Sequence, residues 1–172
     1  MGLLARQFGL PAVCLRYFNV FGPRQAFTPY VGVITIFIQA LQRGEAPTIY
    51  GDGDQQRDFI YVGDIVRATL LALESNVSGE VFNVGSGKGT TVKEVARLLT
   101  EKLQPGLEPR FQPPQPGEIR HSVADISKIR RMLGFRPEGG LAERIDEVIA
   151  WNRSVQAGSR GTAGTRTPTP DP

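Results

Sequence analysis

Short apolar runs alternate along the chain with longer segments in which apolar residues recur every three or four positions. The runs rich in β-branched and aromatic residues predict strands, at 11–20, 48–50, 59–62, 80–85 and around 110–111. Apolar positions at helical spacing predict helices, over 31–43, 65–75, 92–103, 126–133 and 141–152. Strands that alternate with helices in this way are typical of the α/β class.

Two of the predicted helices begin with residues that favour a helix start. Thr91 and Glu94 form a capping box, in which each side chain bonds the other residue's backbone N–H. Asp64 is expected to cap the helix over 65–75. That helix is apolar on nearly all sides, so it is predicted to be buried.

Glycines and the composition of the tail set the other boundaries. Gly44 and Gly134 are expected to end the helices before them, and Gly9 closes a short opening segment, "LLARQF", which resembles the end of a longer helix. From Ser154 the chain has no periodicity and is rich in Gly, Ser, Thr, Arg and Pro. Such a composition is typical of disorder, so we expect a folded unit over 1–152 and a disordered tail over 153–172.

Composition and charge exclude several classes of function. Of 172 residues, 40% are hydrophobic and 22% charged, as in ordinary globular proteins, and the net charge of +3 falls to +2 without the tail. No stripe of Lys and Arg forms, which argues against nucleic acid as a partner. Cys14 is the single cysteine, and no signal peptide or apolar run of membrane length is present. We therefore expect a cytoplasmic protein with no membrane partner.

Several motif-like segments fail on spacing or context. "GSGKGTT" (85–91) has Gly89 after Lys88, so it does not fit the Walker phosphate loop and is interpreted as a strand-to-helix turn. "GSRGTAG" (158–164) has dinucleotide-type spacing but follows polar residues rather than a strand. His121 is the single histidine, which leaves little for a metal cluster or a catalytic triad, so we expect no metal.

The segment "GDGDQQRDFIYVGD" (51–64) carries a single arginine, Arg57, among acidic residues. It lacks the final Glu of a calcium loop and has a cation among the supposed ligands. An arginine at the end of a strand can hold a diphosphate through two parallel hydrogen bonds. The residue pattern leaves a loop salt bridge open as the alternative. We expect the neighbouring acids to orient this arginine: Asp52, Asp54 and Asp58.

Four ordered segments resemble one family. They are "LRYFNVFGPRQ" (15–25), "IYGDGDQQRDFIYVGDIVRA" (49–68), "GEVFNVGSG" (79–87) and "PGEIRHSVADISKIRRMLGFRP" (116–137). Together they resemble the C-terminal half of NAD-dependent nucleotide-sugar epimerases and dehydratases, the extended short-chain dehydrogenases/reductases, and the UDP-glucose 4-epimerase-like variant most of all. The resemblance covers about residues 3–152.

The resemblance implies a fold and a set of roles. The fold would be the C-terminal part of a Rossmann-type parallel sheet with a small α/β substrate-binding domain, and NAD would be the family's cofactor. Phe18 would lie beside the nicotinamide. The residues expected to bind a UDP-sugar are Asn19 and Arg57 at the phosphates, Val33 in the pocket wall, Tyr50 at uracil, and Gln115 and Glu118 in the motif whose acid meets the ribose.

Two departures from the family pattern affect the expected chemistry. Gln115 stands where the family usually has an arginine, which removes a cation from the diphosphate site. Arg120, nearby in sequence, could compensate for it. The family's Gly-rich NAD motif, in its place between a strand and a helix, is absent from this chain. The Tyr-x-x-x-Lys pair is absent as well, because none of the four tyrosines has lysine four positions later. The N-terminal cofactor half is therefore expected to be missing from this chain.

Three hypotheses follow from the sequence. The first is the UDP-sugar-binding part of a 4-epimerase, inactive as an isolated chain, with no catalytic residue of its own. The second is a half that associates with a separately encoded N-terminal half, and the third is a UDP-sugar-binding module without catalysis. Epimerases of N-acetylated sugars, UDP-glucuronate decarboxylases and dTDP-glucose 4,6-dehydratases share the motifs, so the family reaction stays open.

Overall fold

The computed structural model describes residues 7–25, 28 and 32–161. The strands are β1 (Cys14–Tyr17), β2 (Asn19–Phe21), β3 (Thr48–Tyr50), β4 (Gln56–Arg57), β5 (Phe59–Tyr61), β6 (Val81–Val84), β7 (Thr90–Thr91), β8 (Arg110–Gln112) and β9 (His121–Ser122). The helices are α2 (Val33–Gln42), α3 (Val62–Glu74), α4 (Val92–Leu103), α5 (Ser127–Leu133) and α6 (Leu141–Gly161).

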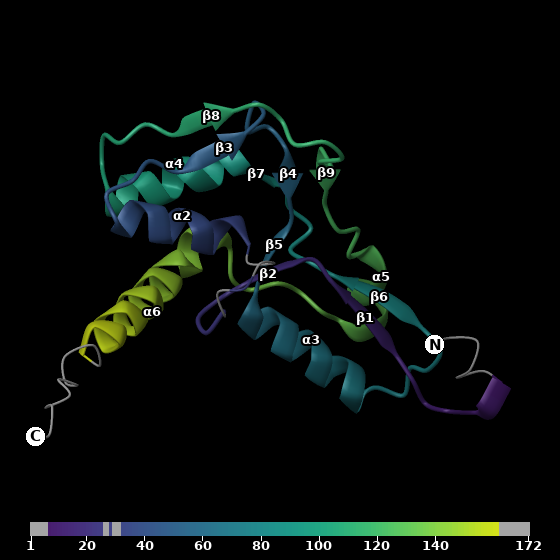
Figure 1. Cartoon of the computed structure of the whole chain (residues 1–172). Coiled ribbons are helices and arrows are strands. Elements are labelled where there is room, and N and C mark those ends of the chain that lie inside the picture. Colours follow the sequence, from purple (N-terminus) through teal and green to yellow (C-terminus); the bar gives the residue numbers. More distant parts are fainter. Residues whose placement is uncertain (1–6, 26–27, 29–31, 162–172) are drawn as a thin grey trace, which may run out of the picture.

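One part of the molecule is built on parallel strand pairs. β1 pairs with β6 and β2 pairs with β5, both parallel, and α3 forms the crossover from β5 to β6. Strands that run in the same direction cannot be joined by a tight turn, so the chain returns through a longer connection such as this helix. α5 packs beside β6, and α3 lies along the lower side of these strands (Figure 1).

The other part carries the remaining strands with α2 and α4. β3 pairs with β8, and β4 lies between β7 and β9 in a three-stranded sheet. α2 packs against α4, and α6 runs down from this part at an angle (Figure 1). The segment β3–β4–β5 connects the two parts, so any side chain on β4 lies at their junction.

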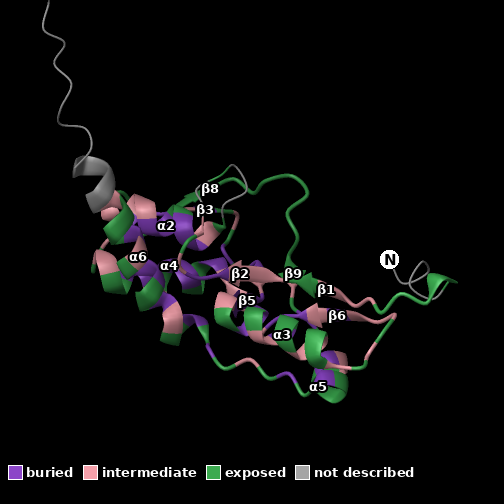
Figure 2. Cartoon of the chain, turned by 90° about the horizontal axis from the view of Figure 1, so that it is seen from below, coloured by how far each residue is buried: buried purple, intermediate pink, exposed green. Residues whose placement is uncertain are grey.

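Two apolar clusters form the core, and β5 contributes to both, Phe59 to one and Ile60 to the other. The first joins α2, α4 and α6 to β5 and has Phe37, Ile38, Leu41, Leu99 and Ile145 fully buried. The second joins β6, α3 and α5 and includes Phe82, Ile129 and Phe135. Figure 2 shows the buried positions concentrated where α2, α4 and α6 meet. Burial of this apolar surface is the main stabilising contribution.

The single strand predicted over 11–20 is wrong in its extent. The structure has two short strands, β1 and β2, which pair with different neighbours, and Phe18 lies between them. The Phe18 N–H donates to Val84 O at 3.0 Å, and the Asn19 N–H donates to Asp58 O at 3.0 Å. The chain therefore changes its hydrogen-bonding partner from β6 to the β5 strand within two residues, which continuous apolar sequence does not reveal.

The predictions for the helix after β5 are also corrected. α3 begins at Val62 with Tyr61 as its N-cap, so Asp64 lies within the first turn and does not cap it. The Asp64 carboxylate instead accepts hydrogen bonds from the backbone N–H groups of Glu138 and Gly139. The helix is not buried throughout, because Val66, Leu70 and Leu73 are 54%, 48% and 78% exposed.

Of the other predicted helix boundaries, some are confirmed and one is corrected. The Thr91–Glu94 capping box is present, and Gly134 ends α5 in the left-handed conformation. The last helix continues past the predicted end at 152, because α6 extends to Gly161. The expected disorder of the tail stays a prediction, and residues 162–172 lie outside the described residues. Within the described ranges, no helix has both the length and the apolar character needed to cross a bilayer.

Candidate functional site

The loop before β4 is a tight turn that fixes the direction of Arg57. Gly51 and Gly53 have φ angles of +74° and +78°, which glycine adopts at little cost. The Asp52 carboxylate accepts from the Asp54 N–H at 2.9 Å, and Lys93 N–H donates to Gly53 O at 3.0 Å. Arg57 then lies in a strand bonded on both sides, with β7 and β9 as neighbours. Its backbone is therefore held firmly.

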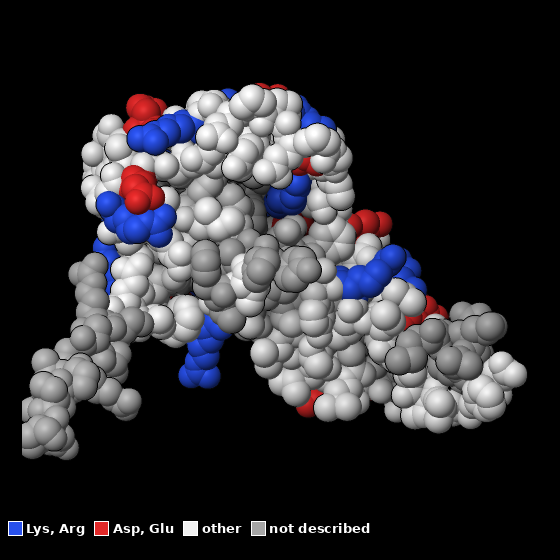
Figure 3. All heavy atoms as spheres, viewed as in Figure 1, with Lys and Arg blue, Asp and Glu red and all other residues white. Residues whose placement is uncertain are grey.

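Beneath this strand lies a cleft of about 340 Å³. All six residues expected to bind a UDP-sugar line it: Asn19, Val33, Tyr50, Arg57, Gln115 and Glu118. They come from β2, α2, β3, β4 and the segment before β9. Figure 3 shows the molecule hollowed near β4, with basic atoms visible in the hollow and acidic atoms beside them. The roles of these residues stay predictions, but the structure brings them together.

Arg57 is not oriented by the three aspartates that the sequence suggested. Its Nη1 donates to the backbone carbonyls of Gln56 at 2.9 Å and Ile119 at 2.6 Å. Its Nη2 lies 3.5 Å from Glu118 Oε1, and the two side chains are 20% and 27% exposed. One face of the guanidinium is therefore fixed by neutral carbonyls, which hold the fork in place without neutralising its charge.

Each of the three aspartates has another partner. Asp52 accepts two hydrogen bonds from Arg120, at 2.8 and 2.9 Å, and the Asp54 carboxylate lies 3.4 Å from Lys93 Nζ. The backbone N–H of Asp54 and then Arg120 lower the pKa of Asp52. Asp58 is fully buried and points elsewhere. The prediction that these three aspartates orient Arg57 is therefore wrong.

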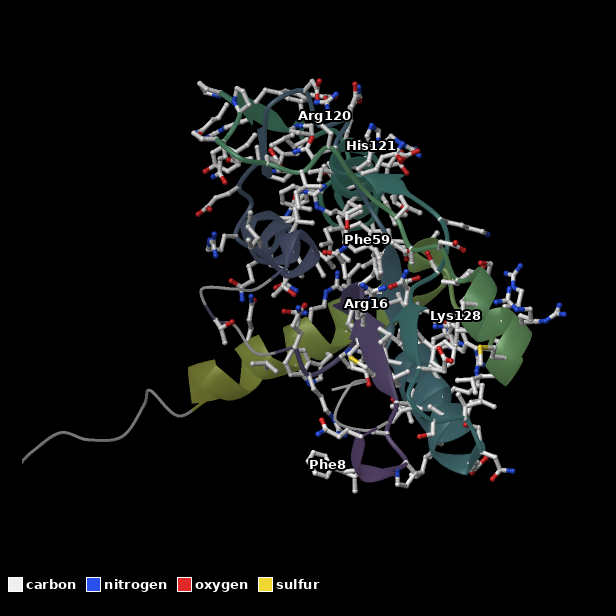
Figure 4. All side chains as sticks on the ribbon, turned by 90° about the vertical axis from the view of Figure 1, so that its right-hand side faces the viewer. Phe8, Arg16, Phe59, Arg120, His121 and Lys128 are labelled. Atoms are coloured by element: carbon white, nitrogen blue, oxygen red, sulfur yellow. The ribbon has the colours of Figure 1, made fainter. Side chains whose placement is uncertain are left out.

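Arg120 does not compensate for Gln115 at the cleft. Its guanidinium is held by Asp52, and it is outside the residues that line the cleft. Figure 4 shows Arg120 and His121 together at one end of the molecule, away from Phe59 at its centre. Gln115 is exposed, and its carbonyl accepts from the Glu118 N–H at 3.4 Å in a turn. Arg57 is then the one cation that lines the cleft within the described part of the chain.

An aromatic ring and a carboxylate complete the polar side of the cleft. Tyr50 lies at the end of β3, is 39% exposed and lines the cleft, and an aromatic ring can stack on a flat base. Glu118 accepts on Oε1 from Gln55 Nε2 at 3.1 Å. The Asn19 side chain donates to Asp58 O at 3.3 Å, which uses one of its two amide N–H bonds.

Sequence reasoning missed two glutamines that line the cleft, Gln25 and Gln55. Gln25 accepts from the hydroxyl of buried Thr35 at 2.8 Å. Gln55 is 3% exposed and follows the acidic residues of the turn. The signal for Gln55 was its place in the same motif as Arg57, two residues away, but nothing in a single sequence distinguishes it from Gln56.

Asp58 anchors the glycine-rich turn after β6. Its carboxylate accepts from Ser86 N–H and Ser86 Oγ at 2.7 Å each, from Gly87 N–H at 2.9 Å and from Ala124 N–H at 3.1 Å. The N–H groups of Ser86 and Gly87 are the kind of backbone donors that a phosphate loop would aim at its anion. Since Asp58 occupies them, the turn over 85–91 does not fit a phosphate.

Phe18, expected beside the nicotinamide, is outside the cleft lining and packs against the second apolar cluster. Among the described residues, the one glycine-rich turn that follows a strand and opens toward a helix, over 85–91, binds Asp58. The role of Phe18 beside the nicotinamide and the weak binding of NAD by this chain alone stay predictions. No cluster of three metal-ligating side chains is found within the same ranges.

Comparison with known proteins places the chain in a family. A model described as the NAD dependent epimerase/dehydratase family matches residues 3–85. A putative UDP-glucose 4-epimerase of Methanocaldococcus jannaschii is 39% identical over 152 residues, which make up 88% of this chain and 49% of that protein. The chain belongs to the NAD-dependent epimerase/dehydratase family. The family expected from the sequence is confirmed.

Other members of the NAD-dependent epimerase/dehydratase family differ in their named activity. A UDP-N-acetyl-α-D-glucosaminuronate decarboxylase of Bacillus cytotoxicus is 37% identical and covers 86% of this chain and 48% of that protein. The crystal structure of UDP-glucose 4-epimerase from Thermotoga maritima with UDP-glucose matches with a TM-score of 0.84 and 42% identity, over 90% of this chain and 50% of that one. The expected Rossmann-type α/β fold is confirmed, and the chain spans about half the length of these relatives.

Proposed function

We propose that this chain is the UDP-sugar-binding part of an NAD-dependent sugar 4-epimerase. One observation carries the proposal: Arg57, Tyr50 and Glu118 line the same cleft of about 340 Å³. A guanidinium fork suits a diphosphate, an exposed aromatic ring suits uracil, and a carboxylate suits the ribose hydroxyls. A binding site of this volume is within the usual range for small-molecule sites.

The part played by these residues is binding and orientation. NAD, when present in a family member, supplies the hydride chemistry. In this chain Arg57 would hold the diphosphate, and Asn19 and Gln115 would add neutral donors beside it. We expect no conversion of UDP-galactose to UDP-glucose by the purified chain with NAD, and detection of such turnover would overturn this part of the proposal.

The binding role is tested by calorimetry with UDP. Replacing Arg57 by alanine removes charge-assisted hydrogen bonds worth about 1.5–3 kcal/mol, so the dissociation constant should rise by roughly 10- to 100-fold. Arg120→Ala is the matched control, because Asp52 holds its guanidinium away from the cleft lining. Undiminished UDP affinity in Arg57→Ala, or an equal loss in Arg120→Ala, contradicts the proposal.

The choice of sugar and reaction is a separate matter. A decarboxylase of a UDP-sugar acid is among the relatives at nearly the same identity as the epimerases. We favour 4-epimerization because the "RYFNVFGPRQ" segment has the form typical of UDP-sugar epimerases. Comparing the affinities of the chain for UDP-glucose and UDP-glucuronate tests the choice of sugar, and a clear preference for the uronate would contradict a UDP-glucose site; it would leave the reaction open, because a UDP-glucuronic acid 4-epimerase of Bacillus cereus is also similar to this chain.

A second surface supports a protein partner. In the described part of the chain β1 is paired on one side only, with β6. Beside it lie apolar side chains that are about half or more exposed: Phe8, Leu10, Tyr17, Val66, Leu70 and Leu73. Figure 2 shows exposed positions along α3, and Figure 4 shows Phe8 projecting at the end of the molecule. An unpaired edge beside apolar surface favours association.

We propose that this surface receives an α/β segment that carries the family's dinucleotide site, on the same polypeptide or on another. Such a segment would pair with the open edge of β1 and cover α3. Co-expression with the N-terminal half of a family member should give a stable complex, and Leu70→Lys with Leu73→Lys should abolish it. Complex formation that survives both substitutions would contradict this docking surface.

A further inference from the structure

Gln55 makes contacts that a turn residue does not need for its own fold. Its side chain is 3% exposed, and Nε2 donates to Tyr50 O at 2.9 Å and to Glu118 Oε1 at 3.1 Å. These acceptors lie 5 and 63 residues away in the sequence. The carboxamide therefore joins the strand that carries the exposed tyrosine to the segment that carries the acid.

The two acceptors also fix which way the amide faces. A flipped amide would turn its oxygen toward the Tyr50 carbonyl and the Glu118 carboxylate, where three acceptor oxygens would meet with no proton between them. In the observed orientation Gln55 Oε1 is buried without a hydrogen-bond partner in the described part of the chain. A buried unpaired acceptor costs free energy, and the two hydrogen bonds that Nε2 donates offset that cost.

Glu118 is placed between two donors as a result. Its Oε1 is shared by Gln55 Nε2 at 3.1 Å and by Arg57 Nη2 at 3.5 Å, while Oε2 accepts no hydrogen bond from the described residues. Without the amide, the guanidinium and the carboxylate would be free to close into a two-bond pair, which is the geometry they prefer. Such a pair would consume the donor and the acceptor that line the cleft.

We propose that Gln55 is a positioning residue for nucleotide binding. It holds Glu118 Oε1 so that Oε2 faces ligand hydroxyls, and it keeps the acid from closing on Arg57, whose Nη2 is left for the diphosphate. This inference rests on the proposed function of the cleft. It assigns no contact between Gln55 and the ligand, because its effect passes through Glu118.

A first experiment needs no ligand. In the NMR spectrum of the full chain, the Gln55 side-chain amide protons should exchange slowly with solvent. Their resonances should shift in Glu118→Ala, because an amide donating to a carboxylate loses that acceptor. Unshifted resonances in Glu118→Ala overturn the positioning role whether or not the chain binds UDP. This readout separates the inference from the proposed function, since absent UDP binding would count against the latter alone.

The second experiment measures UDP affinity by calorimetry. Gln55→Met, which keeps the side-chain length, should weaken UDP binding about tenfold, corresponding to one hydrogen bond to a charged group. In a Glu118→Ala background the same substitution should change the affinity less than about twofold, because the residue through which it acts is gone. An equal loss in both backgrounds, or none in either, overturns the proposal.

Two further variants guard against a simple folding defect. Gln104→Met removes an amide that also donates to a backbone carbonyl, that of Leu41 at 3.1 Å, but outside the cleft lining. It should leave UDP affinity unchanged. Gln55→Asn keeps the amide but is too short to reach both acceptors, so it should bind UDP as weakly as Gln55→Met. Wild-type affinity in the shorter variant contradicts the inference even if Gln55→Met does not fold.

Discussion

The buried carboxylate of Asp58 offers the sharpest test of how the turns around the cleft are held. It accepts four hydrogen bonds from Ser86, Gly87 and Ala124, at 2.7 to 3.1 Å. Its own backbone carbonyl accepts from Asn19, whose side chain lines the cleft. The residue therefore joins the turn after β6, the segment that follows β9 and the edge of the cleft.

The expected loss in the free energy of unfolding follows from those hydrogen bonds. In Asp58→Ala three backbone N–H groups and one hydroxyl lose their acceptor, and each unsatisfied buried donor costs about 1–3 kcal/mol. Because Ser86 and Gly87 are partly open to water, we expect a total of about 4 kcal/mol, a large share of the roughly 5–15 kcal/mol of a typical domain. The isosteric Asp58→Asn places an N–H group against backbone donors and should cost about 2 kcal/mol.

Thermal unfolding followed by circular dichroism measures the effect. At about 2–4 °C per kcal/mol for a chain of this length, Asp58→Asn should melt roughly 4–8 °C below the wild type, and Asp58→Ala lower still. Asp54→Asn is the control in the same loop, since its exposed pair with Lys93 is worth little, and it should melt within about 2 °C. If Asp58→Asn melts with the control, the carboxylate does not hold these turns and the reasoning is refuted.

Three other changes have definite outcomes. Gly85→Ala should lower the melting temperature, because the new Cβ would lie 2.5 Å from Ala124 Cβ and 2.6 Å from Asp58 Oδ2, whereas Gly139→Ala, which meets only the flexible Arg144 side chain at 3.0 Å, should have a smaller effect. Hydrogen bonds from the N–H and hydroxyl of Thr91 lower the pKa of Glu94. The stabilisation of the folded chain by the ionised Glu94 carboxylate is therefore present at neutral pH and lost as the pH falls below roughly 4.5. Glu94→Gln should flatten this part of the profile of melting temperature against pH. Gln115→Arg should tighten UDP binding and steepen its salt dependence, while Gln112→Arg on β8, outside the cleft lining, should not.

How much of the site the sequence could predict is clearest at Arg57. The resemblance identified six residues, and the structure brings all six to one cleft. The partners of Arg57 were not predictable from proximity. Asp58 is adjacent to it, but successive side chains of an extended chain point to opposite faces, so an adjacent acid is badly placed to pair with it. Asp52 pairs instead with Arg120, which lies 68 residues further on.

The fold shows the same division between local and distant information. The Thr91–Glu94 capping box and the glycine at the end of α5 depend on neighbours within four residues, and both were predicted. The break between β1 and β2 was not, because it depends on which strand each segment meets. The apolar sequence of α3 indicated a covered helix, yet Leu73 is 78% exposed. Periodicity reports that a face is apolar, but only the packing shows what covers it.

The cleft and the exposed apolar surface beside β1 are separated by only two residues of the chain. Tyr17, on β1, bonds Thr69 of α3 at 3.0 Å, and Asn19, two residues later, lines the cleft. Any segment that pairs with β1 would fix the backbone from which Asn19 projects. If docking at β1 changes the affinity for UDP by some factor, thermodynamic linkage requires that UDP change the affinity of docking by the same factor. UDP affinity measured with and without the docked segment tests such a coupling, and Phe18 lies between the two surfaces in the chain.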